Sequence, residues 1–400
     1  MSPALPPLSL YVHFPWCVRK CPYCDFNSHA LHGDLPQGDY LEVLLRDLDE
    51  QAEAALGRAV QSVFLGGGTP SLFAPAALAA LLEGVRSRLR LASDAEITLE
   101  ANPGTVERGA FADYRAAGIT RVSLGAQSFS PAQLERLGRI HRVEETRRAA
   151  SELHAAGLSN FNLDLMFALP QQSVAEALSD IEAALALEPA HVSHYQLTLE
   201  PGTLFAARPP AELPDADSAA EMQQLCQQRL EAAGFARYEV SAYARAGARC
   251  RHNLNYWHFG DYLGLGAGAH GKCTRWLEAA LCVERRARVR EPRRYLSERN
   301  GLTRLPVAQR QLPFEFCMNA LRLVEGFEAS EFEQRTGLAL EAMRQSLDRA
   351  VARGQLECTA GRWRASARGF DLLNELLIAF LPEDGERELY TQLAEATSTN

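Results

Sequence analysis

Residues 9–26 read SLYVHFPWCVRKCPYCDF, and this stretch decides how the rest of the chain is interpreted. Residues 9–14 have the apolar, β-branched and aromatic composition of a strand. The loop that follows carries Cys17, Cys21 and Cys24, three of the nine cysteines in the chain. A strand that runs directly into closely spaced thiols indicates a metal or cluster site at the end of that strand.

Three thiols on one loop suit several kinds of site. A cubane [4Fe–4S] cluster takes three thiolates from such a loop and leaves one iron open for a small chelating molecule. A structural zinc ion needs four ligands, for which His13 or His29 is available. Cys21 and Cys24 alone have the C-x-x-C spacing of a thiol–disulfide active site, whereas Asp25 excludes covalent haem attachment through C-x-x-C-H. The ligand count and the loop position favour the cluster.

The first half of the sequence repeats a strand–helix unit six times. Apolar β-branched runs alternate with Ala- and Leu-rich helical patterns, which predicts a parallel sheet with helical crossovers. Polar residues such as Glu100 and Asn102 fall at the ends of the strands, as on the active face of barrel enzymes. We therefore predict an α/β fold with a partial (β/α)6 TIM-like barrel. The predicted strands are 9–14, 62–67, 96–101, 121–127, 161–167 and 191–197, and the predicted helices are 39–56, 75–90, 107–117, 131–156, 173–186 and 217–233.

The pattern changes after residue 245. Residues 250–271 fit neither a long helix nor a strand, and the sequence GAGAHG at 266–271 is predicted to be a flexible turn. Residues 285–294 contain six arginines, which we expect on a solvated helix face or turn, with an anionic ligand as the alternative. Helices at 311–324, 330–337, 341–354 and 368–381, with a hairpin at 356–366, indicate a winged-helix-like module.

The 400 residues divide into three predicted regions: a barrel at 1–245, a linker region at 246–305 and a C-terminal winged-helix-like domain at 306–400. There is no apolar run long enough to span a membrane. The start, MSPALPPLSL, lacks the features of a secretory signal, so we expect a cytoplasmic protein with reduced cysteines. The net charge of −9 argues against broad electrostatic binding of nucleic acid.

The spacing C-x3-C-x2-C resembles that of the radical S-adenosylmethionine (SAM) superfamily. SLYVHFPWC, LGGGTPS, ITLEANP, RVSLGAQSF and LDLMFALP are similar, in this order, to segments of its oxygen-independent coproporphyrinogen III oxidase family. The resemblance implies a radical SAM barrel in which Cys17, Cys21 and Cys24 hold a [4Fe–4S] cluster with SAM on the open iron. It further implies that SAM is contacted by Tyr11, Gly67, Gly68, Thr69, Glu100, Gln127, Arg139 and Asp164.

The types of these residues suit that role. Carboxylates suit the ribose hydroxyls and the surroundings of the sulfonium, and Arg139 suits the methionine carboxylate. Structural alternatives exist for the acidic residues. Glu100 could cap the helix that follows it, and Asp164 could be a buried, hydrogen-bonded strand residue.

Two departures separate the chain from the decarboxylases of that family. The decarboxylases carry a longer N-terminal extension and a fourth cysteine two positions after the third, where this chain has Phe26. Both features resemble instead the haem-chaperone group of the same family. Residues 251–257 strengthen this likeness, because they fit the H-N-x-x-Y-W motif that is implicated there in haem binding. The alternative function is oxidative decarboxylation of coproporphyrinogen III to protoporphyrinogen IX.

The haem-chaperone likeness implies a protein that binds haem and transfers it to acceptor haemoproteins, membrane-associated respiratory proteins among them. His252 is the predicted axial ligand, with His258 and His270 as alternatives. Tyr256 and Trp257 offer flat apolar surfaces for the macrocycle, and nearby arginines could pair with its propionates. The competing structural interpretation places His252 as a hydrogen-bonded linker residue and both aromatic residues in a core.

Overall fold

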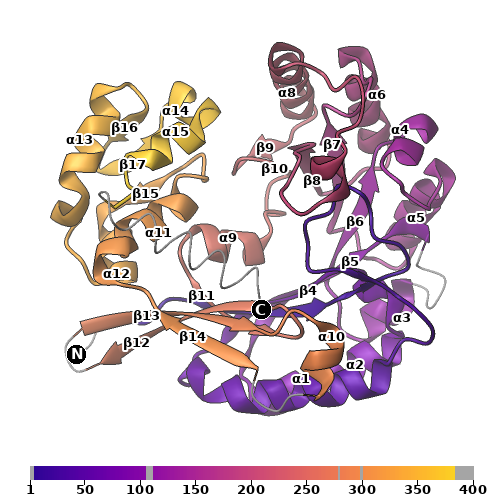
Figure 1. The fold of residues 1–400 in the computed structure, drawn as a ribbon, viewed down its shortest axis with the longest axis horizontal. Coiled ribbons are helices and arrows are strands. Elements are labelled where there is room, and N and C mark those ends of the chain that lie inside the picture. The colour runs from indigo at the N-terminus through magenta and orange to yellow at the C-terminus, as the bar shows by residue number, and fades with distance from the viewer. Residues whose placement is uncertain (1–3, 105–110, 278–279, 298–300, 383–400) are drawn as a thin grey trace.

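Six parallel strands form the middle of the central sheet in a computed structural model of the chain, which describes residues 4–104, 111–277, 280–297 and 301–382 (Figure 1). Each of these strands pairs in parallel with the next. They are β1 (Leu8–Phe14), β4 (Val60–Gly67), β5 (Leu91–Ala101), β6 (Arg121–Gln127), β7 (Phe161–Phe167) and β8 (His191–Gln196). The α/β barrel-like fold predicted from the sequence is confirmed.

Helices connect the strands and cover the outer face of the sheet (Figure 1). They are α1 (Gln37–Gln51), α2 (Pro75–Arg88), α3 (Phe111–Ala116), α4 (Pro131–Arg136), α5 (Val143–Ala155), α6 (Val174–Leu185), α7 (Leu204–Ala207) and α8 (Ala216–Ala232). The predicted helix at 131–156 is two helices, because Gly138 has a φ of 66° and ends the first. Part of the predicted helix at 107–117 lies outside the described residues.

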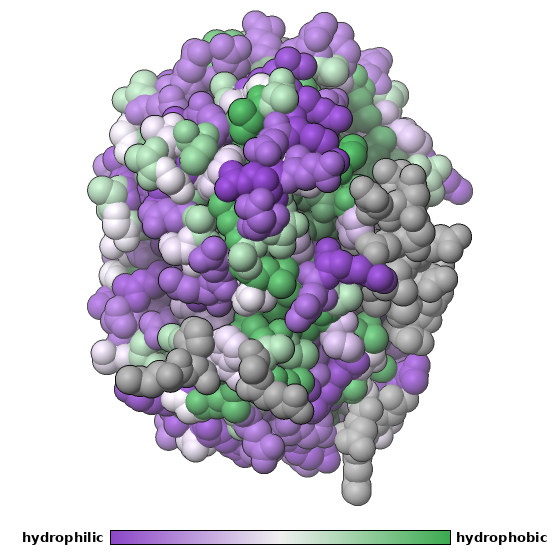
Figure 2. All heavy atoms as spheres, turned by 90° about the vertical axis from the view of Figure 1, so that its left-hand side faces the viewer, coloured by the Kyte–Doolittle hydropathy of each residue, from purple (hydrophilic) through white to green (hydrophobic). Residues whose placement is uncertain are grey.

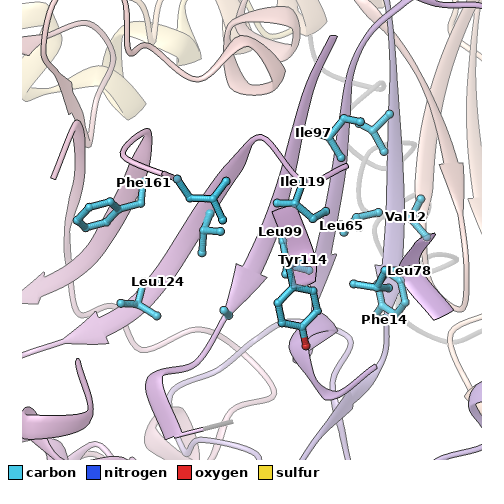
Figure 3. Packing of buried hydrophobic residues seen from close by; sticks show 14 of the residues in the cluster. Val12, Phe14, Leu65, Leu78, Ile97, Leu99, Tyr114, Ile119, Leu124 and Phe161 are labelled. Atoms are coloured by element: carbon cyan, nitrogen blue, oxygen red, sulfur yellow. The ribbon is translucent and has the colours of Figure 1, made fainter. Parts of the chain in front are cut away.

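The core lies between the sheet and these helices. Val12, Leu65 and Leu99 come from neighbouring strands and point toward Leu78 of α2 and Tyr114 of α3 (Figure 3). All five side chains are fully buried. Strands covered on both faces have nearly continuous apolar sequences, which explains why the sequence pattern locates them well.

Residues 246–305, expected to be a linker region, instead extend the central sheet. β11 (Asp261–Leu265) pairs in parallel with β1, and the strands β12 (His270–Leu277), β13 (Ala280–Arg288) and β14 (Leu302–Pro306) follow in antiparallel order. Residues 250–271 therefore include strand, contrary to the expectation from the sequence. At the other edge of the sheet, β8 pairs with β10 (Ala242–Ala244), and β10 pairs with β9 (Ala236–Arg237).

The arginine-rich run at 285–294 corrects a second expectation. Its first part belongs to β13, and α10 (Pro292–Ser297) contains its end. Arg286 and Arg288 are buried rather than solvated. Arg288 forms ion pairs with Asp47 and Glu50 of α1, so this cation joins the late strand to the first helix.

A C-terminal helical domain stands beside the barrel and has its own core (Figure 1). The edge-to-face pair of Phe259 and Phe316, with ring centroids 5.7 Å apart, joins this core to the chain after residue 257. The domain consists of α11 (Leu312–Ala320), β15 (Phe327–Glu328), α12 (Ala329–Thr336), α13 (Arg344–Ala352), β16 (Leu356–Thr359), β17 (Arg362–Ala365), α14 (Ala367–Asp371) and α15 (Leu373–Ile378).

Figure 2 shows the molecule from the side of this domain, where hydrophobic residues line a central band between hydrophilic ones. Within the described ranges, every helix is too short or too polar to span a bilayer.

Candidate functional site

The cysteine loop lies between β1 and α1. The short strands β2 (Trp16–Cys17) and β3 (His29–Ala30) pair in parallel at its base. Cys17, Cys21 and Cys24 are free thiols of intermediate burial. Burial raises the pKa of Cys17 to about 11, so without a bound metal this thiol stays protonated at neutral pH.

The loop is held against the end of β4 by the backbone. The amide of Gly68 donates to the carbonyl of Phe14 at 2.6 Å, and that of Thr69 donates to the carbonyl of Trp16 at 2.8 Å. A Cβ added at Gly68 would lie 2.5 Å from the Trp16 carbonyl oxygen. The missing side chain at this position is therefore required by the close approach of the cysteine loop itself.

Gly67 connects the same strand end to Glu100. Its amide donates to Oε2 of Glu100 at 2.9 Å, and its φ of 113° lies in the region that favours glycine. A Cβ at Gly67 would also meet the His13 ring at 2.4 Å. Burial, and secondarily the charge of Asp164, raise the pKa of Glu100 to about 8, so this carboxyl is largely protonated at neutral pH.

Arg139 reaches the cysteine loop from the segment after α4. Its Nη1 lies 3.6 Å from Sγ of Cys21. Its Nη2 donates to Oδ1 of Asn102 at 2.5 Å and to the carbonyl of Gly125 at 2.9 Å. Asn102 in turn donates to Oγ1 of Thr69 at 3.0 Å. These contacts make Asn102 a residue that positions Arg139 and Thr69, whereas its sequence position indicated only a polar strand end.

Asp164 and Gln127 complete the predicted set on β7 and β6. Asp164 accepts hydrogen bonds from Ser123 and Asn162 at 2.9 and 2.8 Å, and burial raises its pKa. Gln127 has a φ of 64° and accepts a 2.9 Å hydrogen bond from the hydroxyl of Tyr195. Asp164 is thus a hydrogen-bonded strand residue, as the structural interpretation predicted. Contact between Asp164 and SAM stays a prediction.

A cavity of about 560 Å³ opens beside Tyr11, Gly67 and Glu100. Its volume falls within the roughly 300–1,000 Å³ of typical ligand pockets. The remaining lining comes from β1, the end of the cysteine loop, α9 (Arg251–Trp257), β11, the start of β12 with the turn before it, and the segment after β13. The lining residues are Tyr11, His13, Asp25, Phe26, Asn27, Gly67, Glu100, Tyr256, Tyr262, Gly268, His270 and Arg290.

A second cavity, of about 910 Å³, shares Phe26, Asn27 and Arg290 with the first. The amide nitrogen of Asn27 donates to the carbonyls of Ala267 and Arg290, both at 2.9 Å. Asn27 therefore fixes the wall between the two cavities. Nothing in the local sequence around Asn27 indicates this role, because both acceptors belong to a part of the chain more than 200 residues away.

The motif at residues 251–257 forms α9, and its two aromatic residues lie in different surroundings. Tyr256 lines the cavity, with its ring centroid 4.3 Å from that of Tyr262. Trp257 instead stacks against the guanidinium of Arg322, 4.6 Å from the ring centroid. Of the two flat surfaces expected for a macrocycle, only Tyr256 therefore lines the cavity.

His252 is buried behind this wall, with 2% of its surface exposed. Its Nδ1 lies 3.0 Å from Oγ of Ser62, and its ring stacks on Phe64 with centroids 5.0 Å apart. Burial lowers the pKa of His252 to about 3. Its Nε2 is buried and has no hydrogen-bond partner among the described residues. The expected haem ligand is therefore enclosed by protein and is absent from the cavity lining.

The donor set of the cysteine loop suits a cluster better than a single ion. Among the described residues, no three His, Cys, Asp or Glu side chains lie close enough together to hold one metal ion. A cubane cluster binds each thiolate to a different iron, so its ligands stand farther apart than those of one zinc ion. Three free thiols with the Arg139 cation beside Cys21 fit such a cluster.

Comparisons with known proteins agree with this arrangement. Residues 11–184 match the radical SAM superfamily, and residues 307–372 match the HemN C-terminal domain. The structure resembles that of coproporphyrinogen III oxidase (HemN) from Escherichia coli with a TM-score of 0.78 and 22% sequence identity, covering 94% of this chain and 90% of the other. At this identity the likeness shows a shared fold.

Curated relatives are more similar in sequence. The chain is 52% identical over 379 residues to the heme chaperone HemW of Escherichia coli K12, covering 95% of this chain and 99% of that protein. It is 46% identical over 386 residues to the heme chaperone HemW of Haemophilus influenzae, covering 96% and 100%. Likeness of this extent over nearly the full length of both partners shows that the chain belongs to the HemW family of radical SAM proteins.

Proposed function

We propose that this protein is a haem chaperone that binds haem beside its radical SAM site and transfers it to acceptor haemoproteins. The cavity of about 560 Å³ carries this proposal. One side of it is formed by the predicted SAM contacts Tyr11, Gly67 and Glu100, and the other by Tyr256 of the H-N-x-x-Y-W segment. The curated relatives named heme chaperone HemW support the same function.

Membership in the radical SAM superfamily implies a [4Fe–4S] cluster and SAM. We propose Cys17, Cys21 and Cys24 as the cluster ligands, with the cation of Arg139 beside Cys21. When bound, the cluster supplies an electron and SAM supplies a reducible sulfonium. The chain holds the site in shape through the backbone contacts of Gly68 and Thr69 with the cysteine loop. The other predicted SAM contacts, Gln127 and Asp164, are fixed by hydrogen bonds on neighbouring strands.

Aromatic and basic groups of the cavity suit haem. Tyr256 and Tyr262 lie next to each other in the lining, with their rings tilted by 57°, and both offer aromatic contacts to a flat macrocycle. The hydroxyl of Tyr262 accepts a 3.0 Å hydrogen bond from Arg285, which fixes the ring in place. The Arg290 side chain lines both cavities, and its cation suits the carboxylate of a propionate. His252 packs edge-to-face against Tyr256, with centroids 4.9 Å apart, and supports the surface from behind.

Haem titration of the anaerobically reconstituted full chain tests the proposal. We expect stoichiometric haem binding, seen as a shifted Soret band, and a dependence of the affinity on the reduced cluster and SAM. Haem should then pass to an apo-b-type cytochrome at a rate that rises with acceptor concentration, since direct transfer requires an encounter. No haem binding, together with conversion of coproporphyrinogen III and SAM turnover, would establish the decarboxylase instead.

A further inference from the structure

The haem iron needs an axial ligand, and the lining of the cavity contains two imidazoles, those of His13 and His270. The first has both ring nitrogens engaged. Nε2 of His13 donates to the carbonyl of Asn27 at 2.8 Å, and Nδ1 accepts from the hydroxyl of Tyr11 at 3.0 Å. Ligation by His13 would break one of these buried hydrogen bonds and loosen the wall at Asn27.

His252 of α9 and His258, which directly follows α9, are also engaged in other contacts. His252 is enclosed behind Tyr256 and bonded to Ser62, so an iron atom in the cavity cannot reach it without displacing an aromatic ring. His258 lies at the end of α9 and pairs with Glu331 of α12, with 2.6 Å between Nδ1 and Oε1. His258 is absent from the lining of the cavity.

His270 differs from all three. It is the first residue of β12, is exposed, and lies where the glycine-rich turn after β11 returns to the sheet. No described residue hydrogen-bonds its imidazole. The backbone of His270 packs closely on β11, because a Cβ at Gly264 would lie 1.9 Å from the His270 carbonyl oxygen. A side chain that starts from a strand and whose ring nitrogens are available suits a ligand.

We propose that His270, rather than His252, supplies the axial nitrogen to haem iron in this cavity, an inference that rests on the proposed function. In this arrangement the iron lies near the start of β12, and the macrocycle packs along Tyr256 and Tyr262. The H-N-x-x-Y-W segment then builds the wall of the haem site through Tyr256, while its histidine acts as a positioning residue.

Electrostatics supports the same ligand. Although His270 as a whole residue is exposed, partial desolvation of its imidazole against the cavity wall and, less strongly, the charges of Arg285 and Arg290 lower its pKa. The imidazole is therefore neutral at physiological pH, which is the form that binds iron. The same two arginines place positive charge beside the ring, where the propionates of a coordinated haem would be attracted.

Haem titration of four proteins tests the inference: the wild type and the variants His270→Gly, His252→Asn and His258→Ala, each as the reconstituted full chain. We expect His270→Gly to lose the histidine-ligated Soret and electron paramagnetic resonance signatures and to bind haem about tenfold more weakly or worse. Added imidazole should restore the wild-type spectrum of His270→Gly, because it can occupy the space of the missing ring. The control His258→Ala, which changes a histidine outside the cavity lining, should match the wild type in spectrum and affinity.

The possible outcomes distinguish a wrong assignment of the haem ligand from a wrong proposed function. If the wild type binds haem, His270→Gly keeps the wild-type spectrum and His252→Asn loses it, the inference is overturned and the proposed function stands. If the wild type itself binds no haem, the proposed function fails. Because His252 is buried, thermal unfolding of each variant should accompany the titration. His270→Gln, which keeps a polar side chain at the exposed position, provides a second test that does not depend on cavity formation.

Discussion

The guanidinium of Arg139 lies 3.6 Å from the sulfur of Cys21 and also bonds Asn102, which in turn donates to Thr69, so one cation joins the predicted cluster loop to a predicted SAM contact. The sequence suggested Arg139 only as a partner for the methionine carboxylate. Its position implies a second effect, because a positive charge beside a cluster thiolate stabilises the reduced, more negative form of the cluster.

Replacing Arg139 by Gln should therefore change two properties together. The reduction potential of the cluster should become more negative, and SAM should bind about tenfold more weakly, since a charge-assisted hydrogen bond is lost. Potentiometric titration and SAM binding to the oxidised cluster measure the two effects. Arg136→Gln, in the preceding helix and hydrogen-bonded to Gln171, is the matched control. An unchanged potential in Arg139→Gln would contradict the electrostatic role.

Each cysteine of the loop should be necessary for the cluster. Reconstituted wild-type protein should hold about four irons per chain with visible absorption, and Ala at position 17, 21 or 24 should remove most of both. Cys358→Ala, which changes an exposed free thiol in the C-terminal domain, should leave the iron content unchanged. Stoichiometric zinc in a colourless wild-type protein would show that the loop binds a different metal.

Gly68→Ala should disturb the cysteine loop without changing any of its three cysteines. The added Cβ would be forced to within 2.5 Å of the Trp16 carbonyl, so the strand end and the loop must separate. We expect a lower melting temperature and loss of iron on gel filtration. Gly38→Ala is the control, because a Cβ there meets nothing within 4 Å, and it should stabilise the helix by up to about 1 kcal/mol. Normal iron retention in Gly68→Ala would contradict the argument.

The stability of the cluster-free protein should depend on pH through Glu100. Its pKa of about 8 in the folded chain exceeds the usual value of 4.5, so between these values the folded state binds more protons than the unfolded state. The free energy of unfolding should therefore fall as pH rises through this window, by up to about 1 kcal/mol per pH unit from this group. Urea unfolding of wild type and Glu100→Gln at pH 5.5–7.5 isolates the contribution. Equal slopes for the two proteins would exclude Glu100 as the cause.

The C-terminal domain should influence haem binding through Glu315. This residue of α11 forms an ion pair with Arg285, whose other guanidinium nitrogen donates to the hydroxyl of Tyr262 in the cavity wall. Glu315→Gln should weaken haem binding several-fold, while iron content and SAM binding stay unchanged. Glu357→Gln removes the same charge from a pair with Arg364 inside the β16–β17 hairpin and serves as the control. Equal haem affinity in the two variants would show that the ion pair of Glu315 with Arg285 contributes nothing to haem binding.

The sequence was sufficient for the barrel and for most of its rim. Parallel strands covered on both faces give apolar runs that stand out from the intervening helices, so the six strands were located to within a few residues in most cases. Strand ends of one sheet edge meet in space, which is why Glu100 and Gly67, 33 residues apart, could be expected together.

Long-range contacts explain what the sequence did not show. Arg288 lies within an arginine run that resembles a solvated surface, and only the fold brings it to Asp47, 241 residues earlier. The motif that contains His252 cannot reveal which way the ring points. That is decided by Ser62, 190 residues away, and by Phe64 on the same strand. The role of His252 as a haem ligand therefore stays a prediction against which His270 is to be tested.

The position of β1 between β4 and β11 has a consequence for biosynthesis. The first strand to leave the ribosome lies in the interior of the sheet, and one of its two neighbours is made only when Asp261–Leu265 emerges. The side chain of Asn27, at the end of the cysteine loop, likewise has no hydrogen bond to Ala267 until that residue, 240 positions later, has been made. The nascent chain therefore cannot form these contacts of the cysteine loop until residue 267 has been made, and we expect insertion of the predicted cluster to follow that point.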